Sequence, residues 1–292
     1  MYEAPRENEI MLPTIDPDFF KGSHAVIFGG AKGIGAALAR EFARRGARVS
    51  ICDIDLRAAE ATGSAMRGEG HVVHVAQVDV TDESSIAEAL DRARAAFGDE
   101  DIAVNNVGAI VNGRPEDMPL AEWERVHNLN FGAVVRGVGA VLPGMLARGR
   151  GCIVNTASFA GIFPYAASRI PYAAAKAAVI SLSENLAIHC EPLGVRVACL
   201  IPGPVITTIG SSMRNWSPDL PMLGPGRKYT FVTAESAAVR FADGIAAGEI
   251  MISSHETVWE DVRAWATDPD TFIRARIAQA AQGEFGTPEL PA

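Results

Sequence analysis

The sequence of 292 residues predicts an α/β fold, a doubly wound parallel sheet of about seven strands in a single domain with a helical C-terminal extension. Short apolar segments alternate with helical segments of about 10 to 15 residues, which is the pattern of successive β-α-β units. The apolar segments carry no polar face, as strands buried between two helical layers require. No sustained polar linker interrupts the alternation, so we expect one domain.

Four strand–helix units are expected in the first half of the chain. The first helix has apolar residues at Ile34, Leu38 and Phe42 and stops at Gly46. Asp82 stands where it can cap the third helix. The expected strands are residues 24–30, 47–53, 71–80 and 101–106, and the expected helices are residues 33–46, 56–70, 82–98 and about 120–148.

The second half continues the alternation and ends in added helices. Two helices are expected after residue 256, the second capped by Asp268 with Pro269 at its first position. The expected strands are residues 151–158, 195–201 and 249–254, the expected helices run from Tyr172 to Cys190 and from Glu235, and residues 202–233 are irregular. The expected boundaries are an N-terminal arm (1–22), the domain (23–255) and the extension (256–292).

Composition and charge narrow the function classes. Hydrophobic residues make up 48% of the chain and charged residues 21%, typical of a globular protein with a sizeable core. The net charge is -9 and no basic cluster stands out, which argues against nucleic acid and anionic membranes as partners. The polar N-terminus is no secretory signal and no apolar run is long enough to span a bilayer, so a soluble cytoplasmic protein is expected. The four widely spaced cysteines are expected to be reduced, and no metal site is expected.

Glycines gather where the first strand meets the first helix. The segment GGAKGIG runs from Gly29 to Gly35, and Asp53 ends the second strand eighteen residues later. Glycine lets the backbone turn sharply and approach a ligand closely, while the following helix points free N–H groups and its positive dipole end at the same place. Strand, glycine turn, helix and acidic residue together predict a Rossmann-type dinucleotide site.

Two charged residues bear on the choice of dinucleotide. The Asp53 carboxylate would accept hydrogen bonds from the adenosine ribose and repel a 2′-phosphate, which favours NAD over NADP. Lys32 argues the other way, because a cation in the glycine turn could meet a 2′-phosphate. We give Asp53 more weight because its position puts it on the ribose itself. It could instead be a carboxylate at a helix start, a role that Asp55 could also fill.

The segment YAAAK places the phenol of Tyr172 and the ammonium of Lys176 one helical turn apart, in a chain with four tyrosines. Residues four apart share a helix face. The ammonium and the dipole of a helix that starts near Pro171 favour phenolate, so the pKa of Tyr172, ordinarily near 10, is expected to fall. Such a phenol can exchange a proton with an alcohol while a dinucleotide takes the hydride. The alternative is an alanine-rich helix with one tyrosine and one lysine on its flank.

Together with NNVG (105–108), Asn130, Ser158 and PGPVIT (202–207), these features resemble the short-chain dehydrogenase/reductase family in order and spacing over about residues 22–255. The resemblance implies Tyr172 as the general acid/base and Lys176 as the residue that lowers its pKa and holds the nicotinamide ribose. Ser158 would position the substrate oxygen, and Asn130 would support a water-linked proton path.

The resemblance also extends the set of expected cofactor contacts beyond the glycine turn. Asp79 resembles the residue at the adenine edge, and the segment from Pro202 resembles the one that holds the carboxamide. The full set is Gly29, Lys32, Gly33, Ile34, Gly35, Asp53, Asp79, Val80, Asn106, Gly108, Tyr172, Lys176, Pro202, Gly203, Val205 and Thr207. Phe28 and Val107 depart from the family's usual Thr and Ala, which affects the packing around the cofactor more than the chemistry.

The expected substrate side is apolar. The resemblance implies a lid over the substrate at residues 208–233, which contains Met213, Trp216, Leu220, Met222 and Leu223. This lining favours a bulky hydrophobic secondary alcohol or ketone, although the same residues could pack against another subunit. Arg169, Arg214 and Arg227 could pair with an acidic substrate group, although single arginines on loops are usually solvated. The resemblance further implies a homotetramer or homodimer, formed partly by the helices at 120–148 and 172–190.

The expected function is an NAD-dependent oxidoreductase that interconverts a hydrophobic secondary alcohol and its ketone. An alternative enzyme is an NADPH-dependent 3-oxoacyl-thioester reductase, which requires NADPH preference and a basic docking patch; Asp53 and the acidic balance speak against it. A second alternative is a non-catalytic dinucleotide sensor or scaffold, since fold does not determine function. That role predicts loss of the Ser–Tyr–Lys set, which is intact here.

Overall fold

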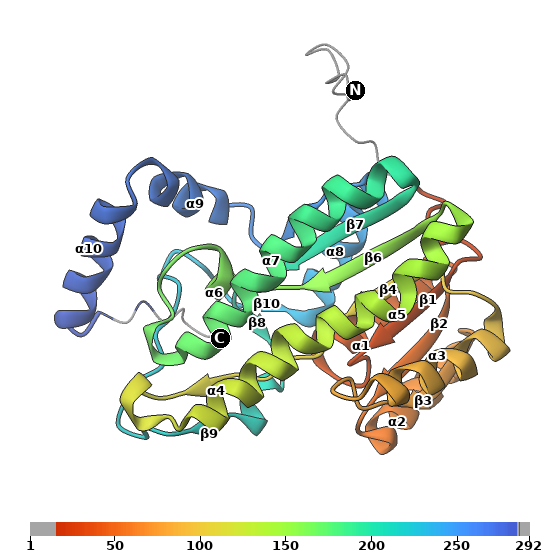
Figure 1. The fold of residues 1–292 in the computed structure, drawn as a ribbon, viewed down its shortest axis with the longest axis horizontal. Coiled ribbons are helices and arrows are strands. Elements are labelled where there is room, and N and C mark those ends of the chain that lie inside the picture. The colour runs from red at the N-terminus through yellow and green to blue at the C-terminus, as the bar shows by residue number, and fades with distance from the viewer. Residues whose placement is uncertain (1–15, 285, 287–292) are drawn as a thin grey trace, which may run out of the picture.

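The computed structural model describes residues 16–284 and 286 and is built around one parallel sheet (Figure 1). The seven strands of this sheet lie in the order β11-β7-β6-β4-β1-β2-β3, and all of their pairings are parallel. They are β1 (His24–Phe28), β2 (Arg48–Asp53), β3 (Val73–Gln77), β4 (Ile102–Asn105), β6 (Gly151–Thr156), β7 (Val195–Ile201) and β11 (Met251–Ser253). The predicted doubly wound sheet is confirmed.

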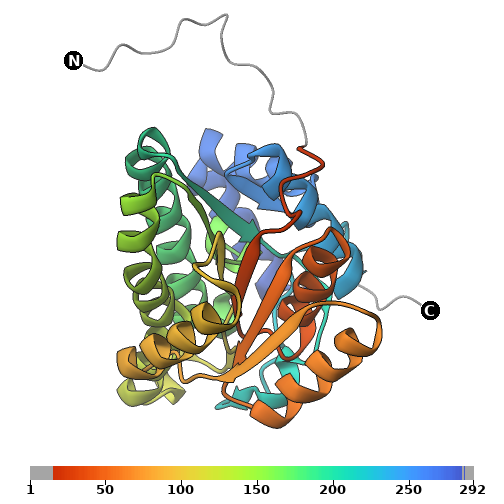
Figure 2. The same ribbon diagram turned by 90° about the vertical axis from the view of Figure 1, so that its right-hand side faces the viewer.

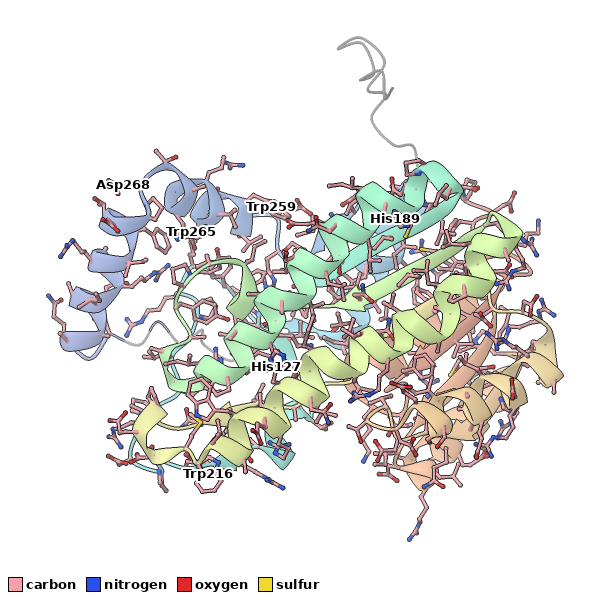
Figure 3. The ribbon with its side chains drawn as sticks, in the orientation of Figure 1. His127, His189, Trp216, Trp259, Trp265 and Asp268 are labelled. Atoms are coloured by element: carbon pink, nitrogen blue, oxygen red, sulfur yellow. The ribbon has the colours of Figure 1, made fainter. Side chains whose placement is uncertain are left out.

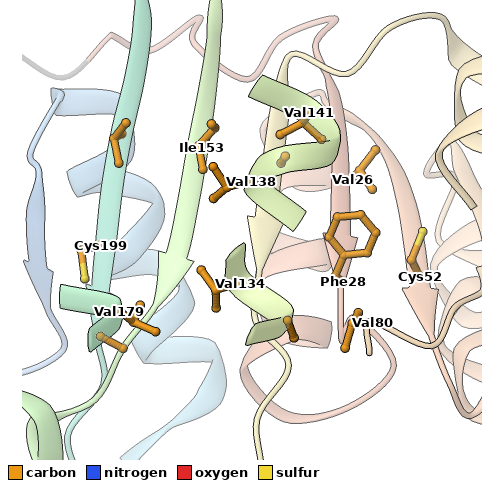
Figure 4. Close-up of a cluster of buried hydrophobic side chains, with 14 of the residues drawn as sticks. Val26, Phe28, Cys52, Val80, Val134, Val138, Val141, Ile153, Val179 and Cys199 are labelled. Carbon is orange, nitrogen blue, oxygen red and sulfur yellow. The ribbon is translucent and has the colours of Figure 1, made fainter. Parts of the chain in front are cut away.

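Helices cover both faces of the sheet (Figure 2). The helices are α1 (Gly33–Arg44), α2 (Leu56–Gly68), α3 (Glu83–Phe97), α4 (Leu120–His127), α5 (Ala133–Arg148), α6 (Phe159–Ile162), α7 (Ile170–Cys190), α8 (Ala234–Ala247), α9 (Val258–Thr267) and α10 (Pro269–Ala281). Helices α3, α5 and α7 share one hydrophobic cluster with the sheet, and α1, α2 and α8 share the other. In Figure 4, Val138 of α5 lies beside Ile153 of β6.

Several helices begin at the capping residues that the sequence indicates. The Asp82 carboxylate accepts a hydrogen bond from the Ser84 N–H, and Asp268, labelled in Figure 3, accepts one from the Thr271 N–H. Both predicted caps are confirmed. Asp55 caps α2 by accepting from the Ala58 N–H, which leaves Asp53 for another role.

Most predicted elements differ from the structure by a few residues at an end, and two predicted helices differ in a way that bears on the site. The helix expected over residues 120–148 consists of α4 and α5 joined by a single π-helical turn, Asn128–Gly132. Helix α7 begins at Ile170, two residues before the predicted start, so that Pro171 stands in its first turn. Proline is tolerated there because first-turn N–H groups have no partner within the helix.

Short strands cross the segment expected to be irregular. The strand β8 (Val205–Ile206) pairs with β10 (Val232–Thr233), and β5 (Val111–Asn112) pairs with β9 (Arg214–Asn215). The β5–β9 pair ties the loop after β4 to the segment 208–233, with Trp216 next in the chain (Figure 3). Strands of two residues are too short to produce a periodic pattern, which is why the sequence does not reveal them.

The joined helix Leu120–Arg148 corrects the expectation that no segment could span a bilayer. It has 29 residues, and a window of 18 residues within it has a mean hydropathy of 1.4, which is sufficient by length and composition alone. Its apolar residues Val134, Val138 and Val141 pack into the cluster beneath the sheet (Figure 4). Helices that cover a buried sheet are apolar for this reason.

Both ends of the described chain pack on the domain. Phe20, within the predicted arm, is buried and stacks on Phe42 with ring centroids 4.5 Å apart. The extension forms the two helices expected for it, α9 and α10, and Phe272 of α10 contacts the Phe163 ring edge-on at 6.3 Å. Residues 1–15 of the predicted arm and residues 285 and 287–292 of the predicted extension lie outside the described residues.

Candidate active site

A cavity of about 490 Å³ opens at the carboxyl ends of the central strands. From β1 the chain proceeds to β2 and β3 on one side, and then crosses to β4 on the other side of β1. Loops that leave such a switch point diverge and form a crevice, which is where open α/β sheets bind ligands. The cavity is lined by residues from the ends of β1, β2, β3, β4, β6 and β7.

The glycine turn shapes one wall of this cavity. Gly29 has a φ of +79°, and a Cβ there would lie 2.9 Å from the Val107 side chain. A Cβ on Gly35 would collide with the Gly29 carbonyl oxygen, so glycine lets α1 start directly against the turn. No side chain caps α1, which leaves its first N–H groups facing the cavity. This cradle fits the pyrophosphate of a dinucleotide.

Acidic groups surround the far end of the cavity. Asp53 lines it while accepting hydrogen bonds from the N–H groups of Ala31 at 3.1 Å and Asp55 at 3.0 Å. The Lys32 ammonium lies 2.7 Å from the Asp55 carboxylate, and this hydrogen bond raises the pKa of Lys32 and lowers the pKa of Asp55. The Lys32 ammonium, which could have met a 2′-phosphate, is therefore already paired with Asp55.

Asn106 ties together the strand ends that frame the cavity. Its Nδ2 donates to the Gly29 carbonyl at 3.0 Å, and its Oδ1 accepts from the Thr156 hydroxyl at 3.3 Å. Phe28 instead points into the hydrophobic cluster beside Val80 (Figure 4). Asn106 thus ties the glycine turn to a neighbouring strand, a contact that Phe28 cannot make because it has no hydroxyl.

Tyr172 lines the cavity, and Ser158, which is not among the lining residues, lies beside the Tyr172 phenol. Ser158 begins α6, and its Oγ accepts a hydrogen bond from the Ala160 N–H at 3.2 Å. Burial raises the pKa of the Tyr172 phenol, and a hydrogen bond with Ser158 and the charge of Arg169 oppose this rise. The expected fall in the pKa of Tyr172 is therefore wrong, because desolvation disfavours phenolate more than nearby donors favour it.

Lys176 lies one turn along α7 from Tyr172, as the spacing predicts. It is almost fully buried, its Nζ donates to the Thr156 carbonyl at 2.7 Å, and it also lines the cavity. Burial lowers the pKa of Lys176 to about 8. The ammonium form survives at neutral pH, where it presents donors to the cavity.

Asn130 occupies the π-helical turn behind the cavity wall. Its Nδ2 donates to the carbonyls of Ala109 and Val126, each at 2.9 Å, and its Oδ1 accepts from the Ala109 N–H at 3.2 Å. The side chain is fully buried and holds the loop after β4 against α4. Asn130 thus shapes the wall rather than lining it.

Most of the predicted cofactor contacts line the cavity, and three do not. The lining includes Gly29, Lys32, Gly33, Ile34, Asp53, Asp79, Val80, Asn106, Gly108, Tyr172, Lys176, Pro202 and Thr207. Gly35 lies beneath the turn, Gly203 packs against the Phe159 ring and donates to Ser254 Oγ, and Val205 lies in β8. Gly203 and Val205 lie outside the cavity because the chain turns away after Pro202, where Gly203 contacts Ser254 and Val205 pairs with β10.

Sequence reasoning missed other residues that line the cavity. They are Ile54, Asp55, Val78, Val107, Ala109, Leu129, Thr156, Ala157, Thr208 and Ile209. Several directly follow the carboxyl end of a strand, so the sheet rule alone could have found Val78, Thr156 and Ala157. The contact from Leu129 comes from the helical turn opposite, for which the sequence carries no signal.

A larger surface hollow of about 680 Å³ lies elsewhere, on the outer side of α4 and α5. It includes Trp123, Phe131, Val135 and Pro171 and none of the predicted site residues. Because it lies away from the strand ends, the smaller cavity remains the candidate active site.

Comparisons with known proteins agree with this geometry. A family model described as short chain dehydrogenase matches residues 23–218. The chain is 37% identical to cis-4-hydroxycyclohexanecarboxylate dehydrogenase of Sinomonas cyclohexanicum over 65% of this chain and 78% of that protein. It is 35% identical to 3-alpha-(or 20-beta)-hydroxysteroid dehydrogenase of Mycobacterium tuberculosis over 68% of this chain and 73% of that protein. A solved short-chain dehydrogenase/reductase from Burkholderia phymatum in complex with NAD superposes with a TM-score of 0.75 at 26% identity, covering 94% and 99% of the two chains.

Proposed function

This chain belongs to the short-chain dehydrogenase/reductase family, and from that premise we propose that it oxidises a hydrophobic cyclic secondary alcohol to its ketone, reversibly, with NAD. The enzyme class itself, a dehydrogenase acting on CH–OH groups, follows from the relatives. The observation that carries the proposal is that Tyr172 and Lys176 line the cavity at the strand ends, with Ser158 beside the Tyr172 phenol. Scaffold proteins have no need of such an arrangement.

The side chains divide the work of moving one proton. When bound, the nicotinamide supplies the hydride acceptor or donor. Tyr172 Oη takes the proton of the substrate hydroxyl in oxidation and returns it to the ketone oxygen in reduction. The Ser158 hydroxyl would orient the same substrate oxygen, and Lys176 would hold the nicotinamide ribose. Because burial favours the neutral phenol, Tyr172 is ready to donate at neutral pH and must lose its proton before oxidation.

Charge at the adenosine end supports NAD as the cofactor. Asp53 and Asp55 both line this part of the cavity, and Lys32 is held by Asp55 at 2.7 Å. A 2′-phosphate would enter beside two carboxylates and meet a lysine that is already paired. The ribose hydroxyls of NAD would instead donate to Asp53.

The apolar surroundings of Tyr172 support a hydrophobic substrate. Its ring belongs to a cluster with Val111, Met118 and Ala160, against which Tyr165 packs. The two relatives are named for a hydroxycyclohexanecarboxylate and for hydroxysteroids, and both of these substrates have a cyclic apolar skeleton. A ring of this kind would bury its apolar face in the cluster while the hydroxyl meets Tyr172.

An oligomer is also part of the proposal. The surface hollow beside α4 and α5 is apolar, and Val135 on that face is 43% exposed. A second copy of the chain packed on this face would cover it. Sedimentation of the purified protein at micromolar concentration would then give a dimer or tetramer, and a monomer would contradict this part.

A turnover screen tests the proposed reaction. The purified protein is mixed with NAD or NADP and cyclic secondary alcohols such as cyclohexanol derivatives and hydroxysteroids, and absorbance of the reduced cofactor is followed. We expect reduction of NAD with at least one alcohol and much slower reduction of NADP. Faster turnover of NADPH with 3-oxoacyl thioesters would favour the alternative enzyme, and absence of any cofactor-linked turnover would favour a sensor.

A further inference from the structure

One arginine near the active site is buried, and no carboxylate of the described residues pairs with it. Arg169 directly precedes α7, three residues before Tyr172, and only 8% of it is exposed. Its Nη1 is buried with no hydrogen-bond partner, and none of the ion pairs among residues 16–284 includes Arg169. Arginine is always charged in proteins, and a buried charge is costly unless it is paired.

The two other arginines that flank the substrate side differ from Arg169. Arg214 in the lid lies 2.9 Å from Glu122, and its side chain is 57% exposed. Arg227 is exposed to solvent. Solvent or a carboxylate thus stabilises both of these charges. Of the three, Arg169 is the one whose burial calls for a partner from outside the chain.

The surroundings of Arg169 place its charge beside the reacting groups. The guanidinium carbon lies 5.4 Å from the centroid of the Tyr165 ring. Tyr165 packs against the apolar cluster that contains Tyr172. The positive charge of Arg169 acts to lower the pKa of the Tyr172 phenol. The same cation can therefore reach a substrate whose hydroxyl contacts Tyr172.

Room for a substituent exists on the other side of Tyr165. A cavity of about 300 Å³ between the lid and α10 is lined by Tyr165, Leu223, Arg227 and Arg276, with Glu284 at its edge. Arg276 already contacts Asp261 at 3.8 Å and Gln279 at 3.3 Å. Arg169 does not line this cavity itself but contacts the Tyr165 ring in its wall, and no carboxylate of residues 16–284 pairs with Arg169.

We propose that Arg169 binds an anionic group of the substrate, most simply a carboxylate, while Ser158 and Tyr172 hold the hydroxyl of the same molecule. This inference rests on the proposed function, since it identifies the substrate class of that site as hydrophobic hydroxy acids and their oxo acids. The planar guanidinium suits a carboxylate, with which it forms short, charge-assisted hydrogen bonds. No bond is made or broken at Arg169, which is a specificity residue.

Calorimetry with two matched probes tests the proposal without requiring turnover. Cyclohexanecarboxylate and the neutral cyclohexanecarboxamide are titrated into the protein in the presence of NAD. Because hydrogen bonds to charged groups are worth about 1.5–3 kcal/mol, we expect the carboxylate to bind at least about tenfold more tightly. Equal affinity for the two probes, or no measurable binding of the carboxylate, overturns the proposal.

Substitutions at Arg169 test whether this residue causes the preference for the carboxylate probe. Arg169→Met should abolish the preference for the carboxylate, and Arg169→Lys should retain part of it because a charge remains without the planar fork. The matched control is Arg214→Met, which removes an arginine from the lid while Glu122 keeps its contact with Arg125 at 2.7 Å. The control should bind both probes as the wild type does. A preference that persists in Arg169→Met overturns the assignment, and if that variant does not fold, Arg169→Gln replaces it.

The two proposals fail in different ways. Oxidation of neutral cyclic alcohols with NAD, combined with equal binding of the two probes, would overturn only the role of Arg169. Tight binding of cyclohexanecarboxylate that depends on Arg169, without NAD-linked oxidation of any alcohol, would overturn only the proposed reaction.

Discussion

The ammonium nitrogen of Lys176 lies 5.9 Å from the centroid of the Tyr172 ring, and it donates to the Thr156 carbonyl rather than to the phenol. The two side chains share one face of α7, as their spacing of four residues predicts. Burial nevertheless dominates both groups, since it raises the pKa of Tyr172 and lowers that of Lys176 to about 8. The predictions below follow from this balance and from the charges around Asp53.

Tyr172→Phe should remove the proton carrier and keep the fold. General acid/base groups contribute about 10²- to 10⁴-fold, so kcat should fall by a factor in that range or more. The ring remains, so NAD affinity measured by calorimetry should change little. Wild-type turnover by the Tyr172→Phe variant would show that another group moves the proton.

The two directions of the reaction should depend on pH in opposite ways. Oxidation requires phenolate, and because the pKa of Tyr172 is raised above its ordinary value of 10, kcat/KM for the alcohol should climb steadily from about pH 7 to about 10. Ketone reduction uses the neutral phenol and should not increase over the same range. Initial rates in both directions, in buffers of constant ionic strength, measure this. An oxidation rate that levels off at or below neutral pH would mean that phenolate forms more easily than burial allows.

Lys176→Met should stabilise the protein at neutral pH while it abolishes activity. The folded-state pKa of about 8 lies below the unfolded value of 10.5, so at pH 7 the buried ammonium costs roughly 3 kcal/mol. The variant also loses the hydrogen bond to the Thr156 carbonyl, which offsets about 1 kcal/mol of the expected gain in stability. The sign follows from proton uptake: between the two pKa values the unfolded state binds more protons, so wild-type stability rises with pH.

Chemical denaturation of the wild type and the variant at several pH values measures this difference. The advantage of Lys176→Met should be largest near neutral pH and shrink as the pH rises through the interval between the two pKa values. Lys32→Met is the matched control, because Lys32 is exposed and should show no comparable gain. A Lys176→Met variant less stable than wild type at pH 7 would mean that the ammonium is better solvated than its burial indicates.

Asp53→Ser should shift cofactor preference from NAD toward NADP. The change removes a charged acceptor for the ribose hydroxyls and the repulsion of a 2′-phosphate, while Lys32 remains nearby. With about 1.5–3 kcal/mol for a hydrogen bond to a charged group, the ratio of kcat/KM for NAD over NADP should fall by about 10- to 100-fold. Glu60→Ser, on the exposed side of α2, serves as the control. An unchanged ratio would place the discrimination elsewhere in the cavity.

Local sequence signals account for much of the fold. All seven strands of the large sheet fall within or overlap the predicted segments, and the caps at Asp82 and Asp268 start α3 and α10 as expected. The sheet rule then brings Gly29, Asp53, Asn106 and Lys176 to one cavity. These features were accessible because capping, hydrophobic periodicity and glycine turns involve residues within a few positions of one another.

Contacts between distant segments decided the rest. Sequence alone determined that Tyr172 and Lys176 share a helix face, that Asp53 ends a strand beside a glycine turn, and that three arginines stand near the substrate side. Only the tertiary structure determined that burial raises the pKa of Tyr172, that Asp55 pairs with Lys32, and that Arg169 is the buried arginine of these three. The reason is physical: desolvation and charge pairing depend on which atoms surround a group, and those atoms come from parts of the chain that meet only after folding.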